Sequence, residues 1–305
     1  MKTTERFSAR LLTALTLIAG SWLVTPQLGS AQAICSAPHS SPTLFESAGN
    51  RTLPHGQGWV QFSSSFNRAT ETFNPFGDRQ DFLANSVFHT RSAYVTAAYG
   101  IHQGVEVWAQ MPIHHLRVDA ANGESRKTGI GDIRTALRVS PALFGLEAPV
   151  ALRLGYKVPG ADFPVDATEL PLTEGQNDFE ASLESGWQPD ALPMYVAGWA
   201  GYRWRSENTD TGHRPGNETF AHLAVGGALG TVGWQVGVDA LWGETPTDQG
   251  LSLTRQQRRL IQIVPSLAAP TGPGVLELSA PIPVSGRNLP ASYGLSVGYR
   301  LVFGR

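Results

Sequence analysis

The sequence predicts an all-β fold: a transmembrane antiparallel up-and-down β-barrel of about twelve strands, preceded by a cleaved signal peptide. Charged residues make up 16% of the 305 positions, well below the roughly 25% of an average soluble domain. Segments of strand length alternate apolar and polar residues, and the connections between them alternate between long and short almost to the end of the chain. Both patterns are typical of outer-membrane barrels. A soluble β-sandwich with Greek-key links predicts no such alternation of loop lengths.

Composition excludes several other classes. Hydrophobic residues make up 41% of the chain and the net charge is only −2, so an intrinsically disordered chain is excluded. The 23 basic and 25 acidic residues leave no basic excess for binding nucleic acid. A single Cys excludes a disulfide scaffold. We expect no cofactor and no metal site, because the adjacent His114 and His115 would point to opposite faces of a strand.

The first 33 residues have the pattern of an export signal. Lys2, Arg6 and Arg10 precede an apolar stretch at 11–24, and Ala31-Gln32-Ala33 forms a cleavage site. The stretch is shorter than the roughly 20 residues that a spanning helix needs. The expected domains are therefore a signal peptide at 1–33, an N-terminal periplasmic segment at 34–57 and an outer-membrane β-barrel at 58–305.

Alternation justifies each strand, and it is clearest in the last one. There, Tyr293, Val297 and Phe303 share one face while Gly294 and Arg300 share the other. An apolar face with aromatic residues at both ends is typical of a lipid-facing strand of about 9–11 residues. In chain order the same reading predicts strands at 59–66, 88–99, 105–113, 130–139, 150–158, 178–187, 195–205, 219–229, 234–242, 260–267, 275–284 and 292–303.

The predicted connections fall into two sets. Because the number of strands is even, both ends of the barrel chain lie on the side of the short turns, which is the periplasmic side in outer-membrane barrels. The short or medium connections are expected at 100–104, 140–149, 188–194, 230–233, 268–274 and 285–291, and the long ones at 67–87, 117–129, 159–177, 206–218 and 243–259.

Several motifs along the chain resemble those of one protein family. Gly104-Val105-Glu106-Val107 followed by Met111-Pro112-Ile113 resembles its strand signature after a turn, and Gly129-Ile130-Gly131-Asp132-Ile133 resembles its strand opening. Lys157-Val158-Pro159-Gly160, followed by Asn177-Asp178-Phe179, resembles a further stretch, although the usual Thr between Pro and Gly is missing. This family comprises outer-membrane transporters associated with meta-pathway phenol degradation. The resemblance covers about residues 55–303 and implies transport, with hydrophobic aromatic compounds as the associated solutes.

The inward-facing residues define the candidate site, because a barrel of this size leaves a narrow lumen. Two interpretations are open: a charged constriction that screens solutes, or cross-strand ion pairs such as Arg153 and Lys157 with Asp178–Glu184 that stiffen the wall. Since the two signs nearly balance, strong ion selectivity is not expected. The predicted lumen residues are Glu106, Trp108, Asp132, Arg134, Arg138, Arg153, Lys157, Asp178, Glu180, Glu184, Arg203, Arg205, Asp239 and Arg300.

Aromatic residues give two further candidates. Alternation places Trp108 and Trp199 inward, where they would stack an aromatic solute unless they belong to an interfacial girdle. The first long loop, around residues 73–77, would either fold over the mouth as a gate or form an exposed apolar tip.

The predicted function is that of an outer-membrane channel for passive uptake of small hydrophobic or aromatic solutes. The alternatives are a structural or adhesive barrel with a plugged lumen and a membrane-embedded lipid hydrolase. A hydrolase needs a Ser and a His within hydrogen-bond reach, and His89 and Ser92 would lie on opposite faces, so we expect no enzyme. The expected partners are the solute, the barrel-insertion machinery, and outer-membrane lipid and lipopolysaccharide, which the basic run at 255–259 would contact.

Overall fold

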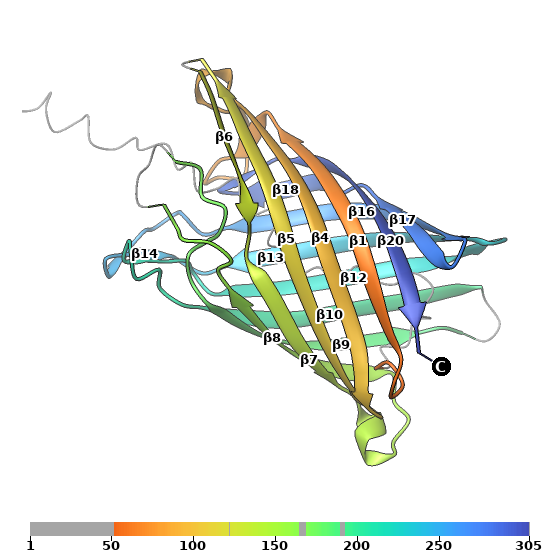
Figure 1. Ribbon diagram of the computed structural model, residues 1–305. Coiled ribbons are helices and arrows are strands. Elements are labelled where there is room, and N and C mark those ends of the chain that lie inside the picture. Colours follow the sequence, from red (N-terminus) through yellow and green to blue (C-terminus); the bar gives the residue numbers. More distant parts are fainter. Residues whose placement is uncertain (1–51, 122, 165–168, 190–192, 305) are drawn as a thin grey trace, which may run out of the picture.

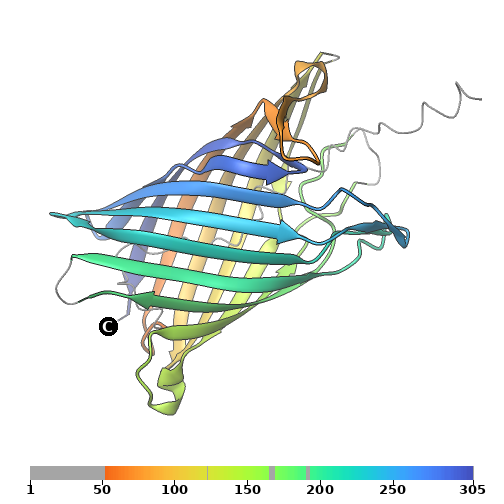
Figure 2. The same cartoon turned by 180° about the vertical axis from the view of Figure 1, so that it is seen from behind.

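The computed structural model describes residues 52–121, 123–164, 169–189 and 193–304. The expected signal peptide at 1–33 lies outside these ranges, and so does the expected N-terminal segment apart from residues 52–57. The all-β prediction is confirmed: the chain forms one large antiparallel sheet that closes on itself (Figures 1 and 2). Within the described ranges, no helix is long and apolar enough to cross a membrane.

Twelve wall positions make up the closed barrel, as the sequence predicts. The main sheet has 14 strands, but β6 with β7 and β17 with β18 each form one interrupted wall strand. Closure is made by β20, which pairs with β1 from Gly58↔Phe303 to Arg68↔Tyr293. The wall strands are β1 (Gly58–Ala69), β4 (Val87–His102), β5 (Val105–Ala120), β6 (Gly123–Ile130), β7 (Ile133–Val139), β8 (Val150–Val158), β9 (Asp178–Trp187), β10 (Met194–Arg205), β12 (Glu218–Leu229), β13 (Val232–Gly243), β16 (Arg259–Thr271), β17 (Gly274–Ser279), β18 (Ile282–Arg287) and β20 (Tyr293–Phe303).

The wall strands are strongly tilted. Figure 1 shows β1, β4 and β5 running steeply across the front, while β10, β12 and β13 behind them run nearly across the view. Figure 2 shows this second wall from its outer side. A sheet closes into a barrel only when its strands tilt relative to the barrel axis, so the crossing of the two walls follows from closure.

The two ends of the barrel differ in their connections. At the end where β1 begins and β20 finishes, the turns are short, for example 103–104, 230–231 and 272–273. We call this the turn end and the opposite one the loop end. The loop end carries two small sheets, one of β2 (Glu71–Phe73), β3 (Arg79–Asp81) and β19 (Leu289–Pro290), the other of β11 (His213–Arg214), β14 (Thr247–Asp248) and β15 (Leu251–Ser252).

The predicted alternation of faces is present along the wall. Phe62 and Leu223 are 54% and 60% exposed on the outside, whereas their neighbours Gln61 and His222 are 4% and 6% exposed. Closure pairs the backbone groups of every wall strand, which is what the hydrocarbon interior of a membrane requires. The core of this protein is therefore its polar inner face rather than an apolar layer.

The predicted long loop at 117–129 is wrong. β5 continues to Ala120 and β6 begins at Gly123, so this segment is a hairpin rather than a loop. Arg117 forms an ion pair of 2.7 Å with Asp119 on its own strand and one of 3.1 Å with Glu124 across the hairpin. In this hairpin, charged residues stand at the outward positions that apolar residues occupy elsewhere. The apolar outward stripe therefore ends before the two strands do.

A second difference concerns the predicted strand at 275–284. It is broken at Ala280–Pro281 into β17, which pairs with both β16 and β20, and β18, which pairs with β16. Proline lacks the N–H that a central strand would donate, so the pairing is interrupted there.

The first long loop combines the two forms that the sequence left open. Phe73 is buried at the loop end, where it packs with Leu241, Leu260 and Leu289. Phe76, three residues later, is 69% exposed. The loop therefore packs one aromatic residue against the barrel wall and exposes the other.

Candidate functional site

The predicted register of the inner face agrees with the structure. The side chains that the sequence places in the lumen are buried or half-buried on the inner face, where most of them contact inward side chains of neighbouring strands. They are Glu106, Trp108, Asp132, Arg134, Arg138, Arg153, Lys157, Asp178, Glu180, Glu184, Arg203, Arg205, Asp239 and Arg300.

One group of charges lies at the loop end of the lumen, and we call it the mouth cluster: Lys157, Glu174, Asp178, Arg203, Arg205, Glu218 and Arg258. Lys157 Nζ lies 2.6 Å from Glu174 and 2.8 Å from Asp178. Arg205 lies 2.5 Å from Glu174 and 3.2 Å from Glu218. The predicted pairing of Lys157 with the 178–184 strand is therefore present, but the cluster also recruits a loop carboxylate, Glu174.

The mouth cluster reaches from one side of the wall toward the other. Arg258, the residue before β16, donates to Glu174 at 3.3 Å and also to Glu218 of β12. Lys157 and Arg205 approach the same Glu174 carboxylate from β8 and β10. Side chains from the part of the wall that runs from β8 round to β16 therefore meet at one loop residue.

Glu174 is held ionised by this arrangement. Burial by itself would raise the pKa of Glu174, but the nearby Arg205 and Lys157 lower it well below its ordinary value. A carboxylate that is buried and charged is stable only with such partners. The loop is consequently fixed in the mouth by ion pairs that persist at neutral pH.

The rest of this loop lies against the inner wall. Leu170 and Leu172 are buried against the inward-facing Leu116 and Val118 of β5. Glu169 of the same loop makes an exposed ion pair of 2.6 Å with Lys127 of β6, which lies opposite Leu116 in the register. The loop between β8 and β9 therefore has an apolar contact, a buried ionic contact and an exposed ionic contact within a few residues.

A second group of charges lies nearer the turn end. Arg138 of β7 lies between Glu106 of β5, at 2.9 Å, and Glu184 of β9, at 2.8 Å. Arg153 makes no ion pair within 4.0 Å with β9, although its charge acts on Glu180 of that strand; its guanidinium lies over the Trp108 ring, 4.5 Å from the centroid. A cation over an aromatic face is favourable. Trp108 therefore packs against Arg153 on the inner face of the barrel.

The start of the described chain enters the lumen at the turn end. Leu53 is buried with Trp59, Trp108 and Ala136, which face inward, and its N–H donates to Glu106 Oε2 at 2.9 Å. Gly100 makes this path possible, since an added Cβ would lie 2.2 Å from the Pro54 carbonyl oxygen. Residues 52–57 thus occupy part of the turn-end mouth.

The opposite wall carries an aromatic pair. The Trp199 indole stacks on the His222 imidazole with 3.9 Å between ring centroids and 11° between planes. His222 Nδ1 lies 2.5 Å from Asp239 Oδ1, and Gln262 Nε2 donates to Asp239 Oδ2 at 3.0 Å. Trp199 therefore faces inward, as alternation predicts. It stacks on His222, which Asp239 and Gln262 hold in place through hydrogen bonds.

Several site residues escaped the sequence reading. Glu218 and Glu277 lie at inward positions of predicted strands or directly beside them, so alternation could have found them. Glu277 accepts from Gln61 at 2.7 Å and pairs with Arg300 at 3.2 Å. Glu174 and Arg258 lie in loops, where no periodic signal exists. Ser92 Oγ lies 2.7 Å from Nδ1 of His114 on β5, a different histidine from the nearby His89.

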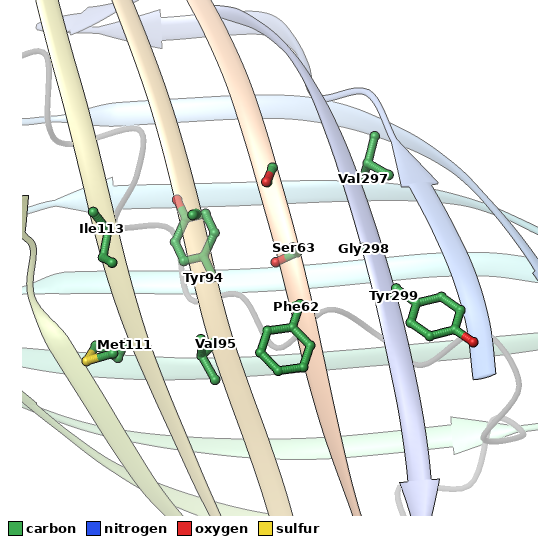
Figure 3. Close-up of a pocket in the computed structure, with 11 residues that line it drawn as sticks. Phe62, Ser63, Tyr94, Val95, Met111, Ile113, Val297, Gly298 and Tyr299 are labelled. Carbon is green, nitrogen blue, oxygen red and sulfur yellow. The ribbon is translucent and has the colours of Figure 1, made fainter. Parts of the chain in front are cut away.

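The outer surface has grooves of its own, distinct from the lumen. One of about 330 Å³ lies among Phe62, Val95, Met111, Ile113 and Tyr299, with Tyr94 turned away from the outward side chains (Figure 3). It forms because outward Ser64 and Ala93 are small beside large neighbours. These side chains belong to the face that contacts acyl chains, so we place no solute site there.

A closed barrel with an apolar outer band and an ion-paired polar interior is an outer-membrane β-barrel, which places the chain in the outer membrane. Residues 63–299 match the family described as "Putative MetA-pathway of phenol degradation", and the chain belongs to that family.

Solved structures are similar in fold. The COG4313 outer membrane channel from Pseudomonas putida F1 is 16% identical, with a TM-score of 0.69 over 83% of this chain and 97% of that one. The translocator domain of the autotransporter NalP from Neisseria meningitidis is 9% identical, with a TM-score of 0.47 over 82% and 90%. The TodX monoaromatic hydrocarbon channel deltaS2 mutant is 6% identical, with a TM-score of 0.42 over 85% and 92%. No curated protein sequence matches the chain.

Proposed function

We propose that this barrel is an outer-membrane channel for the passive entry of small, uncharged hydrophobic or aromatic solutes. The observation that carries the proposal is that most charges of the inner wall are paired with one another. Arg138 lies between two glutamates, and Lys157 and Arg205 share acidic partners. Paired charges leave little net field along the lumen, so neither sign of ion is favoured.

Two further points support this function. The description of the family refers to phenol degradation, and the solved barrel with the same fold is an outer membrane channel from Pseudomonas putida F1. The mouth cluster and Leu53 also place side chains at the two ends of the lumen, which favours small solutes over large ones. Under this proposal, the predicted lumen residues named above form the constriction that screens solutes.

One observation favours a second candidate, a barrel with a plugged lumen. Arg258, Glu174 and Glu218 join loop and wall residues across part of the mouth, and Leu53 occupies part of the other end. If both contacts are permanent, the barrel is structural or adhesive and carries no solute.

Planar bilayers distinguish the two candidates. The full mature chain is inserted, its conductance in KCl is recorded, and phenol is added to test for current blockade. The channel predicts a small conductance, a reversal potential near zero in a KCl gradient, and blockade by phenol. Absence of conductance both in the native barrel and in the Glu174→Gln variant supports the plugged barrel and contradicts the channel.

We propose further that the barrel is not an enzyme. The Ser92–His114 pair has the spacing of a nucleophile and a base, yet the charged group that acts on His114 is Arg134, a cation. A base of this kind is normally oriented by a carboxylate. Both side chains are also buried in the wall. Phospholipid hydrolysis by the refolded barrel that Ser92→Ala abolishes would contradict this view.

A further inference from the structure

Four inward side chains from consecutive wall strands form one connected unit. In order around the wall they are Trp199 of β10, His222 of β12, Asp239 of β13 and Gln262 of β16. Gln262 donates to Asp239, Asp239 lies 2.5 Å from His222 Nδ1, and His222 stacks on Trp199. We call this unit the indole support. Trp199 and Asp239 are both half-exposed, whereas Gln262 is buried and the side chain of His222 is 5% exposed.

Small neighbours let the support lie flat against the wall. An added Cβ at Gly237 would lie 2.6 Å from His222 Cε1, so the imidazole lies directly over that glycine. The inward positions on either side of Trp199 along β10 are Ala197 and Gly201, which have little or no side chain. The indole is therefore not covered from its own strand.

Stability alone does not account for the support. Burying an ionisable pair is often neutral or unfavourable compared with apolar packing. In addition, His222 Nε2 is buried and has no hydrogen-bond partner among the described residues. A buried polar atom without a partner costs free energy, and such costs concentrate at functional positions. What the arrangement does achieve is a fixed orientation for one indole in the lumen.

We propose that Trp199 is an aromatic-stacking subsite of the lumen, and that His222, Asp239 and Gln262 are positioning residues for it. This inference rests on the proposed function, since it assumes that aromatic solutes enter the lumen. A planar ring offset-stacked on the indole gains an attraction that an aliphatic ring of equal size lacks. Trp199 would thus select aromatic over saturated rings, and Arg138 and its partners would not.

Phenol and cyclohexanol, which have the same size and one hydroxyl each, test this selectivity. In planar bilayers, the concentration that blocks half of the current is measured for both probes in the native barrel and in the Trp199→Leu variant. We expect the variant to raise the value for phenol about 2- to 10-fold and to leave cyclohexanol unchanged. Trp199→Phe keeps a ring and should restore most of the phenol blockade. Asp239→Asn should weaken it in the same direction but less.

Trp242→Leu is the matched control, because Trp242 is on β13 but faces outward and is 42% exposed. It should change neither value. Folding of each variant is checked by its heat-dependent shift in gel mobility. If Trp199→Leu changes both probes equally, or neither, the stacking subsite is wrong while the channel stands. If the native barrel is not blocked by phenol at all, the channel and the subsite are both wrong.

Discussion

At Arg138 one guanidinium serves two carboxylates, Glu106 of β5 and Glu184 of β9. These three residues come from different strands and become neighbours because β5, β7, β8 and β9 follow one another in the wall. All three are largely buried, so each depends on the others for its charged state. The neutrality of the lumen is thus a property of particular pairs rather than of the overall composition.

Replacing Arg138 tests that dependence. Arg138→Met should leave two buried carboxylates unpaired, which costs about 3–5 kcal/mol of the free energy of unfolding. It should also shift the reversal potential in a KCl gradient toward cation selectivity. Urea unfolding in vesicles and bilayer recordings measure the two effects.

Arg126→Met is the control for that substitution, since Arg126 is exposed on β6. It should change stability by less than about 0.5 kcal/mol and leave selectivity unchanged. Equal effects of the two substitutions would mean that the pairs around Arg138 do not set the lumenal field.

At the scale of elements, the loop between β8 and β9 connects several wall strands at the loop end through its ion pairs. It is fixed by a buried ion pair of Glu174 with Lys157 and by an exposed ion pair of Glu169 with Lys127. The two carboxylates are five residues apart in the same loop, but one is buried among three cations and the other is 58% exposed. This difference provides a matched pair of variants.

Glu174→Gln should release the loop and raise single-channel conductance several-fold, because Lys157, Arg205 and Arg258 lose their common partner. Glu169→Gln removes only an exposed pair, worth about 0–1 kcal/mol, and should leave conductance unchanged. Bilayer recordings of both variants make the comparison. An unchanged conductance in Glu174→Gln would show that its ion pairs do not close the mouth.

The pH dependence of the loop follows from the same residue. Since the pKa of Glu174 is lowered from its ordinary value of 4.5 by Arg205 and Lys157 against the effect of burial, its contribution to stability is fully present above that value. The contribution is lost only as pH falls through the lowered pKa. Conductance of the native barrel should therefore stay constant between about pH 7 and 5. An opening in that range would mean that another group controls the loop.

For the whole molecule, the decisive feature is the apolar outer band around a closed wall. Leu223 lies near the middle of β12 and is 60% exposed, whereas Leu251 lies on β15 at the loop end and is 74% exposed. Similar exposure therefore has different meanings, because one residue faces acyl chains and the other lies beyond them. Exposure alone does not distinguish them; position in the barrel does.

Leu223→Arg should lower the free energy of unfolding in a bilayer by about 2–4 kcal/mol, the cost of an arginine on the lipid face near the midplane. Leu251→Arg should have almost no effect. Urea titrations of both variants in phospholipid vesicles measure the difference. Equal stability would contradict the placement of β12 in the hydrocarbon layer.

The sequence by itself determined the faces. A strand has a period of two residues, so alternation alone assigned Arg134, Arg203 and Arg300 to the inside and Val238 and Leu295 to the outside. It failed where the outward stripe ends before the strand does, as in the β5–β6 hairpin, because charged residues outside the membrane look like a loop.

The tertiary structure alone decided which inward residues meet. Glu174, Arg258 and Leu53 lie outside the wall strands, where no period applies, and they reach the lumen only because loops and the start of the barrel chain fold into its two mouths. Gln61 and Glu277 are 216 positions apart and bond only because the sheet closes. Alternation is local along the chain, whereas closure and loop insertion depend on the whole of it.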